Sequence, residues 1–485
     1  MNGDRLSTVD ETFLVIEAPR TPMHGASLAI FEGAPLLDDH GRLRLHEVRA
    51  HIDARLGLLP RLRQRIATVP FGFGRPVWVD DEQFDIANHV DVAAVAPPGD
   101  EAALLRLTEE VLMEPLDRSL PLWHFLFVTG LRDGRVALIE RAHHAMVDGV
   151  SGVDVSLVLL DSAADAPPAK PEAWTPMSPP SGPTLMVDAL RDRLVESLAV
   201  AAEVAGSLRR PFEAAHRTGD IMSALRTVGA NGILAPRTSL NVPIGSRRRV
   251  SLLRYRLADI KRPGRSSGAT VNDVVLAAAA GGLRALFVSR GEPVGSAQSA
   301  RVLVPVSLRD PTEPVELGNR VGALLTSLPV GVGDPVERLS RVSATTRSLK
   351  SSAEAGTTDL LLRAADLLPL CATRFVQATV HQQPLVNSVV TNVPGPPSPL
   401  YALGARMLEA YPLAPLGGNI SLEVAVLSYD GALTIGITSD IETCPDVDVF
   451  VEGMEQSFAA LGAGRALGLG IGVGQHTASG LATSS

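Results

Sequence analysis

The segment 125–160 constrains the fold most, because it predicts two strands and a helix in direct succession. Phe125–Val128 and Val136–Glu140 are short apolar runs typical of strands, and Gly130–Gly134 between them has turn chemistry. After a polar start at Ser151, the apolar residues with helical spacing are Val153, Leu157, Val158 and Leu160. A side chain at such a strand-to-helix junction is held rigidly and still reaches a cavity.

Two adjacent histidines lie at this junction. His143 and His144 are followed by Asp148 and Gly149. Imidazoles titrate near neutrality, and an Asp-Gly pair favours a sharp turn with a carboxylate at its entrance. Three interpretations are open: two buried, hydrogen-bonded histidines; a metal site shared with Asp148; or one histidine as a general base, with the other and Asp148 as its support.

The rest of the chain bears on these alternatives. A metal site needs three or four ligands, and the two cysteines, Cys371 and Cys444, lie far away without ligand spacing, so we expect no metal. No G-x-S-x-G segment occurs, and neither cysteine has a local nucleophile signature. Direct attack by a deprotonated substrate hydroxyl or thiol is then the simpler chemistry.

The residues His143–Gly149 form the HHxxxDG signature of acyltransferases built like chloramphenicol acetyltransferase, a group that includes carnitine acyltransferases and the condensation domains of peptide synthetases. Nearly end to end, the chain resembles the bacterial wax ester synthase/diacylglycerol acyltransferase family, and within it an actinobacterial type of triacylglycerol synthase. The blocks that carry this resemblance are Leu6–Leu14 with Thr21–His24, Pro115–Trp123, Thr270–Leu276, Glu316–Val321 and Thr391–Gly395.

The resemblance implies an α/β fold of two chloramphenicol-acetyltransferase-like domains with mixed sheets and a tunnel between them. It implies an acyl-CoA-dependent O-acyltransferase that esterifies diacylglycerol or long-chain fatty alcohols, with acyl-CoA as a substrate and no cofactor. The family pattern favours His144 as the general base and His143 as its support. We expect Asp148 to hold the loop and Gly149 to keep the entrance open. The alternative is a weakly active relative that binds acyl-CoA or neutral lipid.

Further residues in these blocks have structural and functional interpretations. Trp123 is expected to be a core anchor that supports the site. Asn272 or Asp273 either caps the following helix or, in the case of Asn272, lends an amide to the thioester carbonyl. Thr391 and Asn392 begin a proline-rich loop that suits a substrate wall as well as a plain turn.

Basic clusters are expected to meet the phosphates of coenzyme A. The candidates are Arg247–Arg249 and Lys261–Arg265, and the alternative for each is a solvated surface.

Composition narrows the classes of partner. The net charge of −9 argues against nucleic acid, and two cysteines indicate a reducing cytoplasm. The N-terminus lacks a signal layout, and no apolar run reaches the roughly 18 residues of a membrane span. Because the implied acceptors are membrane lipids, we expect peripheral contact with a membrane or lipid droplet.

The length of 485 residues predicts two domains. The expected boundaries are an N-terminal domain at 1–162, a Pro-rich linker with an amphipathic helix at 163–236, a C-terminal domain at 237–465 and a Gly/Ser-rich tail at 466–485. The apolar face of that helix consists of Val187, Leu190, Leu194, Leu198 and Ala201 or Ala202. Its polar face has mixed charge and is not basic, so we expect the apolar face to pack on the protein itself; the alternative is a helix on a membrane surface.

The second domain repeats the hairpin of the first without its histidines. Leu422–Ser428 and Leu433–Ile437 flank an Asp430-Gly431 turn, and Ile441 stands where a base would be. One active site per chain follows.

Overall fold

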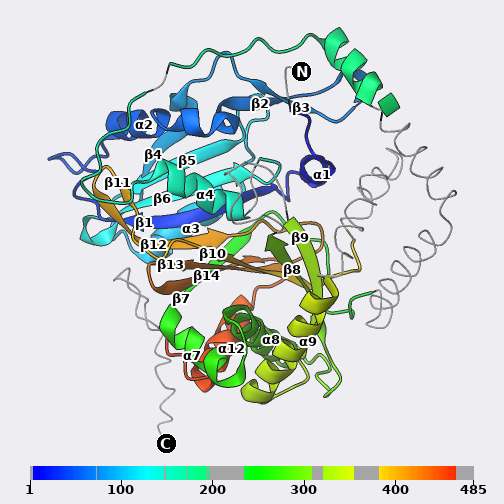
Figure 1. The fold of residues 1–485 in the computed structure, drawn as a ribbon. Helices are drawn as coiled ribbons and strands as arrows, with labels where there is room; N and C mark the ends of the chain where they lie inside the picture. Colours follow the sequence, from blue (N-terminus) through cyan, green and yellow to red (C-terminus); the bar gives the residue numbers. More distant parts are fainter. Residues whose placement is uncertain are drawn as a thin grey trace, which may run out of the picture.

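Two six-stranded sheets form the middle of the molecule, and helices cover them (Figure 1). The computed structural model describes residues 4–465 except 73, 147–148, 172, 193, 196–233, 308–320 and 354–381. The expected α/β class with mixed sheets is confirmed, since each large sheet contains both parallel and antiparallel strand pairs.

The first sheet has the strand order β11-β12-β1-β6-β5-β4. Its strands are β11 (Tyr401–Ala402), β12 (Ala405–Leu413), β1 (His24–Phe31), β6 (Val136–His143), β5 (Trp123–Thr129) and β4 (Val90–Ala94). Only β4 and β5 run parallel among its neighbouring pairs. The predicted hairpin is confirmed as β5–β6, and its turn uses positive φ angles at Asp133 (61°) and Gly134 (65°).

Alternate residues of β6 face two different layers. Val136 and Leu138 pack in one cluster with residues of α2 (Leu45–Asp53) and α4 (Gly149–Leu159). Ala137 and Ile139 pack in another with residues of α3 (Glu101–Val111). The period of two along a strand therefore places helices on both faces of this sheet. The remaining elements of this half are α1 (Thr8–Ile16), the hairpin β2 (Gln64–Ala67) and β3 (Val77–Asp80), and short 3-10 turns at Leu56–Leu58, Pro60–Arg63, Pro70–Gly72, Ile86–Asn88 and Arg132–Gly134.

The second sheet has the order β7-β14-β13-β10-β8-β9. Its strands are β7 (Arg248–Arg256), β14 (Ala432–Asp440), β13 (Leu422–Tyr429), β10 (Ser388–Pro394), β8 (Ala300–Ser307) and β9 (Val321–Leu328). β10 runs parallel to both of its neighbours, whereas the other pairs are antiparallel. The hairpin expected to repeat that of the first half is present as β13–β14.

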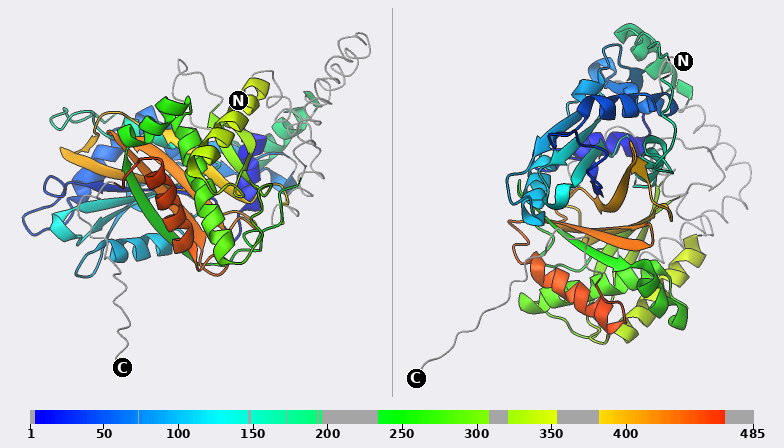
Figure 2. Two further views of the ribbon diagram at one scale, coloured as in Figure 1. Left: turned by 90° about the horizontal axis from the view of Figure 1, so that it is seen from below. Right: turned by 90° about the vertical axis from the view of Figure 1, so that its left-hand side faces the viewer.

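Helices cover the side of the second sheet that faces away from the first (Figure 2). They are α7 (Leu257–Ser267), α8 (Val271–Ser289), α9 (Pro335–Ala353) and α12 (Val447–Ala460). By length and hydropathy alone α8 could cross a membrane, but 72% of its apolar window is buried inside the protein. It is the central helix of this core, packed against α12 and α9.

The chain crosses between the sheets near its end. β12 lies in the range expected for the second domain, yet it pairs with β1 and so completes the first sheet. It also contacts β13 and β14 of the second sheet, where a Cβ added to Gly436 would lie only 2.0 Å from the Pro412 carbonyl oxygen. The two halves are therefore joined through a shared strand.

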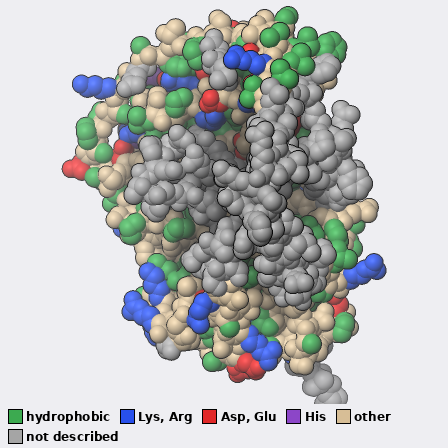
Figure 3. Space-filling view, turned by 45° about the vertical axis from the view of Figure 1, so that its right-hand side comes forward, with side chains coloured by type: hydrophobic (Ala, Val, Ile, Leu, Met, Phe, Trp, Pro, Cys, Tyr) green, Lys and Arg blue, Asp and Glu red, His purple; other side chains and the backbone are tan. Residues whose placement is uncertain are grey.

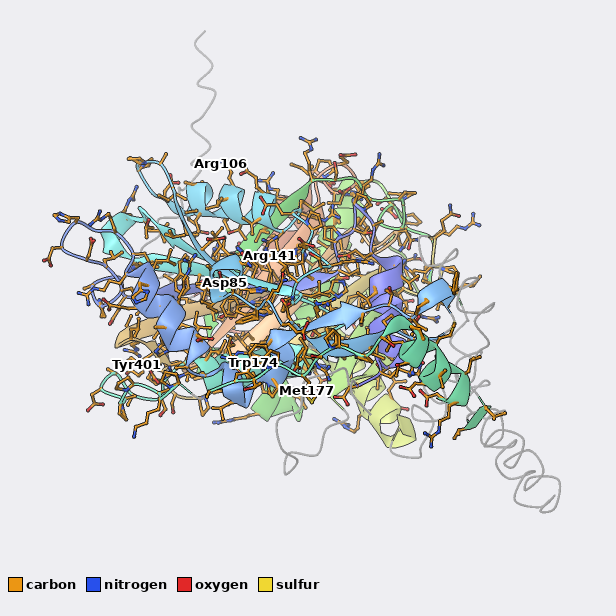
Figure 4. The ribbon with its side chains drawn as sticks, turned by 90° about the horizontal axis from the view of Figure 1, so that it is seen from above. Asp85, Arg106, Arg141, Trp174, Met177 and Tyr401 are labelled. Carbon is orange, nitrogen blue, oxygen red and sulfur yellow. The ribbon has the colours of Figure 1, made fainter. Side chains whose placement is uncertain are left out.

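The segment after α4 returns over the first half. Trp174 meets Phe84 edge-on, and the Met177 N–H donates to Asp80 at 3.0 Å; Figure 4 labels both linker residues. A helix then runs over 182–192 and 194–195.

The helix packs on the protein as expected, but not through the expected face. Leu185 and Ala189 are buried against Val69, Val77 and Val79, whereas Val187, Leu190 and Leu194 point outward. Leu198, Ala201 and Ala202 of the expected face lie outside the described residues. The exposed fractions are 64% for Val187, 52% for Leu190 and 62% for Leu194. Ala189 lies so close to Gly74 that a Cβ there would be 2.7 Å away, so a small residue and not the larger apolar stripe makes the contact.

Candidate active site

The histidine pair lies where β6 ends, and the backbone around it is held on both sides. The His143 N–H donates to the Leu122 carbonyl at 2.9 Å, and the His144 N–H donates to the Met23 carbonyl at 2.8 Å. The Met146 N–H closes a turn onto the His143 carbonyl at 2.8 Å. These backbone hydrogen bonds fix the positions of the Cα atoms that carry both imidazoles, independently of any side-chain contact.

Both ring nitrogens of His143 face polar groups, and its side chain is buried. Its Nδ1 accepts a hydrogen bond from the Ala145 N–H at 3.0 Å, so the proton of the neutral ring belongs on Nε2. Nε2 lies 3.5 Å from Oε1 of Glu17. A ring held in this way suits support better than proton transfer with a substrate.

His144 is half-buried and lies against Phe13 and Gly25. Its imidazole stacks on Phe13 with ring centroids 4.9 Å apart and an interplanar angle of 22°. It also lies over Gly25, where a Cβ would stand 3.6 Å from Nε2. The pair therefore has one enclosed ring and one partly accessible ring.

Glu17 is a residue of this site that sequence reasoning missed. Burial raises the pKa of its carboxyl, but the nearby His143 and hydrogen bonds from Arg118 and the Met23 N–H outweigh burial and lower the pKa to about 2. Arg118 donates to Oε2 from Nε at 3.1 Å and from Nη2 at 2.6 Å. Both residues stand in or beside the sequence blocks that carry the family resemblance, which is the only signal that pointed to them.

A third histidine lies beside the pair. His24 on β1 is the direct cross-strand partner of His143 and is 2% exposed. Burial lowers its pKa to about 3, aided by the nearby charges of Arg141 and His143 and opposed by Glu17. His24 therefore stays neutral at physiological pH. Arg141, labelled in Figure 4, donates to the Val111 and Glu114 carbonyls at the end of α3.

The structure brings two of the other predicted residues together. Asn392 at the end of β10 donates from Nδ2 to Oδ1 of Asn272 at 3.5 Å. Val393, the next residue, packs in the same cluster as Ala145 and Met146, which follow the histidines. The two asparagines thus lie on the second sheet and its helix, next to a strand end that meets the histidine turn. Thr391 pairs in register with Ala425 of β13.

Asp273 has a structural contact set. The N-cap of α8 is Thr270, and the expected capping is confirmed for Asp273 only as the N3 member of the capping box. Asp273 and Thr270 form a reciprocal capping box, in which each side chain accepts the backbone N–H of the other. Asp273 also accepts a hydrogen bond from the Thr346 hydroxyl at 2.6 Å. Both of its carboxylate oxygens are therefore engaged by neighbouring chain.

Trp123 lies in the core beside the site. Its Nε1 donates to the Leu62 carbonyl at 2.8 Å, and its ring stacks on His89 at 4.6 Å. It supports the site as the cross-strand partner of Ala142, as a member of the cluster that holds Ala145 and Met146, and next to the Leu122 carbonyl that holds the His143 backbone.

Other predicted residues are partly or wholly outside the described residues. Asp148 and the block Glu316–Arg320 are among those left out. Gly149 is the first residue of α4. Within the described chain, no group of three or more His, Cys, Asp or Glu side chains is arranged to hold a metal ion.

One of the basic candidates for coenzyme A is already occupied. Arg248 is buried, its Nη1 lies 3.3 Å from the Asp440 carboxylate, and its Nη2 donates to the Arg20 carbonyl. A buried, paired guanidinium is not available to a phosphate. The expectation that Arg248 binds the phosphates of coenzyme A is therefore wrong. Arg249 pairs with Asp448 at 3.1 Å, and Arg262 pairs with Asp259.

Two family models cover most of the chain. That of the wax ester synthase/diacylglycerol acyltransferase catalytic domain matches residues 6–275, and that of the family's C-terminal domain matches residues 317–462. The chain belongs to the wax ester synthase/diacylglycerol acyltransferase family. As a member of this family it is an acyltransferase, and the resemblance stated from the sequence blocks is confirmed.

Curated relatives of this acyltransferase match along almost their whole length. "Probable diacyglycerol O-acyltransferase tgs1" of Mycobacterium tuberculosis is 32% identical, with 94% of this chain and 96% of the relative covered. "Probable diacyglycerol O-acyltransferase tgs2" of the same organism is 30% identical, with 94% and 98% covered.

Solved structures confirm the expected fold. The wax ester synthase/diacylglycerol acyltransferase of Marinobacter aquaeolei VT8 matches with a TM-score of 0.64 at 24% identity, with 94% of this chain and 98% of that one covered. A starter condensation domain of rhizomide synthetase RzmA matches with a TM-score of 0.59 at 15% identity, with 95% and 94% covered. This acyltransferase therefore has the two-domain architecture of the condensation domains. The tunnel expected between the domains stays a prediction.

Proposed function

We propose that this acyltransferase transfers the acyl group of an acyl-CoA to the hydroxyl of diacylglycerol, with His144 as the general base. The observation that carries the proposal is the inequality of the two histidines. His143 is enclosed, with a polar group at each ring nitrogen, whereas His144 is half-buried and oriented by Phe13 and Gly25. The names of the mycobacterial relatives support diacylglycerol as the acceptor.

In the proposed reaction, His144 accepts the proton of the acceptor hydroxyl while the oxygen attacks the thioester carbonyl carbon. A tetrahedral oxyanion forms, and its collapse breaks the carbon–sulfur bond. The protonated His144 then returns its proton to the thiolate, so that an ester and free coenzyme A leave. No covalent acyl-enzyme is formed, and acyl-CoA is a substrate in a reaction that we propose to need no cofactor.

Asn272 is the proposed donor to the oxyanion. The Asn272 Oδ1 accepts a hydrogen bond from Asn392. This contact fixes the orientation of the Asn272 amide, so its Nδ2 points away from Asn392 and remains a donor for the oxyanion. An amide N–H placed where negative charge develops stabilises the transition state. We propose Asn392 as the residue that sets this orientation, Asp148 as the residue that holds the loop after the histidines, and Gly149 as the residue that keeps the entrance open.

The test is a single substitution at the base. We expect His144→Ala to slow acyl transfer by about 10²–10⁴-fold, since a general base contributes that much. Its melting temperature should stay near that of the wild type, because the ring is half-buried. The assay measures triacylglycerol and free thiol formed from hexadecanoyl-CoA and diacylglycerol. His46→Ala, on the exposed side of α2, is the matched control and should keep full activity.

A wild-type rate in His144→Ala would refute the base assignment. Absence of turnover in the wild type, together with binding of acyl-CoA, would favour the weakly active lipid-binding relative. Offering hexadecanol beside diacylglycerol in the same assay tests the further proposal that fatty alcohols are accepted and wax esters are formed.

We propose that the enzyme reaches its acceptor by peripheral contact with a lipid surface. Phe71 is 89% exposed, and Val187, Leu190 and Leu194 project from the helix beside it; we call these four residues the apolar rim. Gly182 at the helix start lies against Pro70, so the rim is continuous with the Phe71 turn. Hydrophobic side chains gather at the height of this helix, along the top of the molecule in Figure 3. Exposed apolar groups gathered in this way are typical of membrane or partner contact.

A further inference from the structure

We propose that α1 is a positioning element for the histidine pair, in which Glu17 acts on His143 and Phe13 acts on His144. The inference rests on the proposed role of His144 as base. Phe13 lies inside α1 and Glu17 is its C-terminal cap, so one helix delivers a contact to each imidazole.

The helix itself is firmly placed at both ends. Ser7 and Asp10 form a reciprocal capping box at its start, and Leu14 is buried in the core beneath the first sheet's helices. At its end the chain leaves helical geometry at Glu17, with φ −63° and ψ 130°. That change of direction turns the Glu17 side chain away from the helix and toward the end of β6.

Arg118 fastens this end of α1. Its Nη2 donates to the Leu14 carbonyl at 2.7 Å and to Oε2 of Glu17 at 2.6 Å, while its Nε donates to the same oxygen at 3.1 Å. One guanidinium therefore satisfies a carbonyl at the helix C-terminus and orients the carboxylate that follows it. Oε1 is left to face the histidines.

Oε1 of Glu17 connects to both histidines. It lies 3.5 Å from Nε2 of His143 and accepts the Met23 N–H at 3.1 Å. The Met23 carbonyl in turn accepts the His144 N–H. The carboxylate thus faces the protonated Nε2 of one ring, whose tautomer the Ala145 N–H sets, and holds the backbone of the other ring through a single peptide unit.

The charge of Glu17 matters as well as its geometry. When a histidine of this pair takes up a proton, a nearby carboxylate stabilises the imidazolium and raises its pKa. Among the residues that the structure describes, the other charged or titratable groups around the pair are Arg118, which offsets part of this charge, Arg141 on β6, and His24 on β1, whose pKa lies near 3. Of these described groups, Glu17 is the acidic one that faces His143 directly.

The experiment compares Glu17→Gln with the wild type in steady-state kinetics. Glutamine keeps the shape and an oxygen acceptor but removes the charge. We expect kcat to fall about 10- to 100-fold, as for a small misplacement of a catalytic group, while KM for acyl-CoA stays unchanged. The acidic limb of the pH profile should move to lower pH, because the imidazolium loses its stabilising charge. Glu17→Asp should recover part of kcat.

Two further variants complete the design. Phe13→Leu keeps apolar bulk and removes the stacked ring, so kcat should again fall without a change in KM. Asp53→Asn is the matched control: it neutralises another carboxylate paired with an arginine, Arg63 at 2.9 Å, and should leave kcat and the pH profile as they are.

A folded Glu17→Gln enzyme with the wild-type kcat and pH profile would overturn the inference. If that variant fails to fold, Phe13→Leu decides, and wild-type kcat there overturns it. The two proposals fail separately: full activity in His144→Ala removes the base itself, whereas loss in His144→Ala with an unaffected Glu17→Gln removes only the positioning role.

Discussion

Glu423 on β13 is an acidic side chain kept in the interior of the protein at 6% exposure. Burial raises the pKa of its carboxyl to about 8, against the opposing effect of Arg248. The folded state therefore prefers the protonated form more than the unfolded chain does. Its contribution to stability is present at acidic pH and is lost as pH rises from the unfolded value of 4.5 through 8.

We predict that Glu423→Gln stabilises the protein at pH 8 and changes little at pH 5. The amide stays neutral at both values, so the cost of ionising a buried acid disappears. Urea unfolding midpoints of wild type and variant at the two pH values measure the effect. Glu82→Gln, an exposed position, serves as control and should show no pH-dependent difference. Equal midpoints for Glu423→Gln and the wild type at pH 8 would contradict the prediction.

At the same scale, the sequence was sufficient to place the histidine pair after a strand. It was not sufficient to rank the two rings by geometry. That ranking depends on the Ala145 N–H, on Gly25 and on Phe13, and the last two come from segments more than a hundred residues away. Glu17 was missed for the same reason, since only the folded chain brings it to His143.

The contact between α8 and α12 depends on glycines at the crossing. A Cβ on Gly282 would lie 2.6 Å from the Phe450 carbonyl oxygen, and one on Gly453 would lie 2.6 Å from the Ala285 Cβ. We predict that Gly282→Ala destabilises the second domain by about 1–3 kcal/mol, because the two backbones must move apart. Thermal unfolding measures this. Gly295→Ala is the control, since a Cβ there meets nothing within 4 Å, and it should leave the transition unchanged.

Among the elements, hairpins were predictable and helix orientation was not. The β5–β6 and β13–β14 hairpins follow from apolar runs around Asp-Gly turns, a local signal. The helix at 182–195 has a clear apolar stripe, but the sheet edge beside it accepts Leu185 and Ala189 instead. Periodicity identifies a helix and its faces, and it does not say which face meets the protein.

At the scale of the whole molecule, we predict that the apolar rim governs binding to lipid. Replacing both Leu190 and Leu194 with serine should weaken flotation with phosphatidylcholine/phosphatidylglycerol vesicles by at least about ten-fold, because each buried leucine contributes roughly 1.5–3 kcal/mol. Turnover of a short acyl-CoA with a water-soluble alcohol should persist. Leu58→Ser, at a 68% exposed leucine outside the rim, is the control. Unaltered flotation of the double variant would place the lipid contact elsewhere.

The two-domain organisation could be predicted from the length and the repeated hairpin. The insertion of β12, from the C-terminal half, into the first sheet could not. Alternating apolar residues predict that a strand exists, without naming its neighbour. The pairing of β12 with β1 joins segments roughly 380 residues apart in the sequence.

That pairing has a consequence for biosynthesis. β1 leaves the ribosome before either of its neighbours, and β12, the partner of one edge, follows roughly 380 residues later. At about 5–20 residues per second, the edge waits some 20 s or more. An unpaired edge recruits other strands during that time, so newly made chains need protection until β12 emerges. A chain cut before Ala405 would keep the edge open permanently.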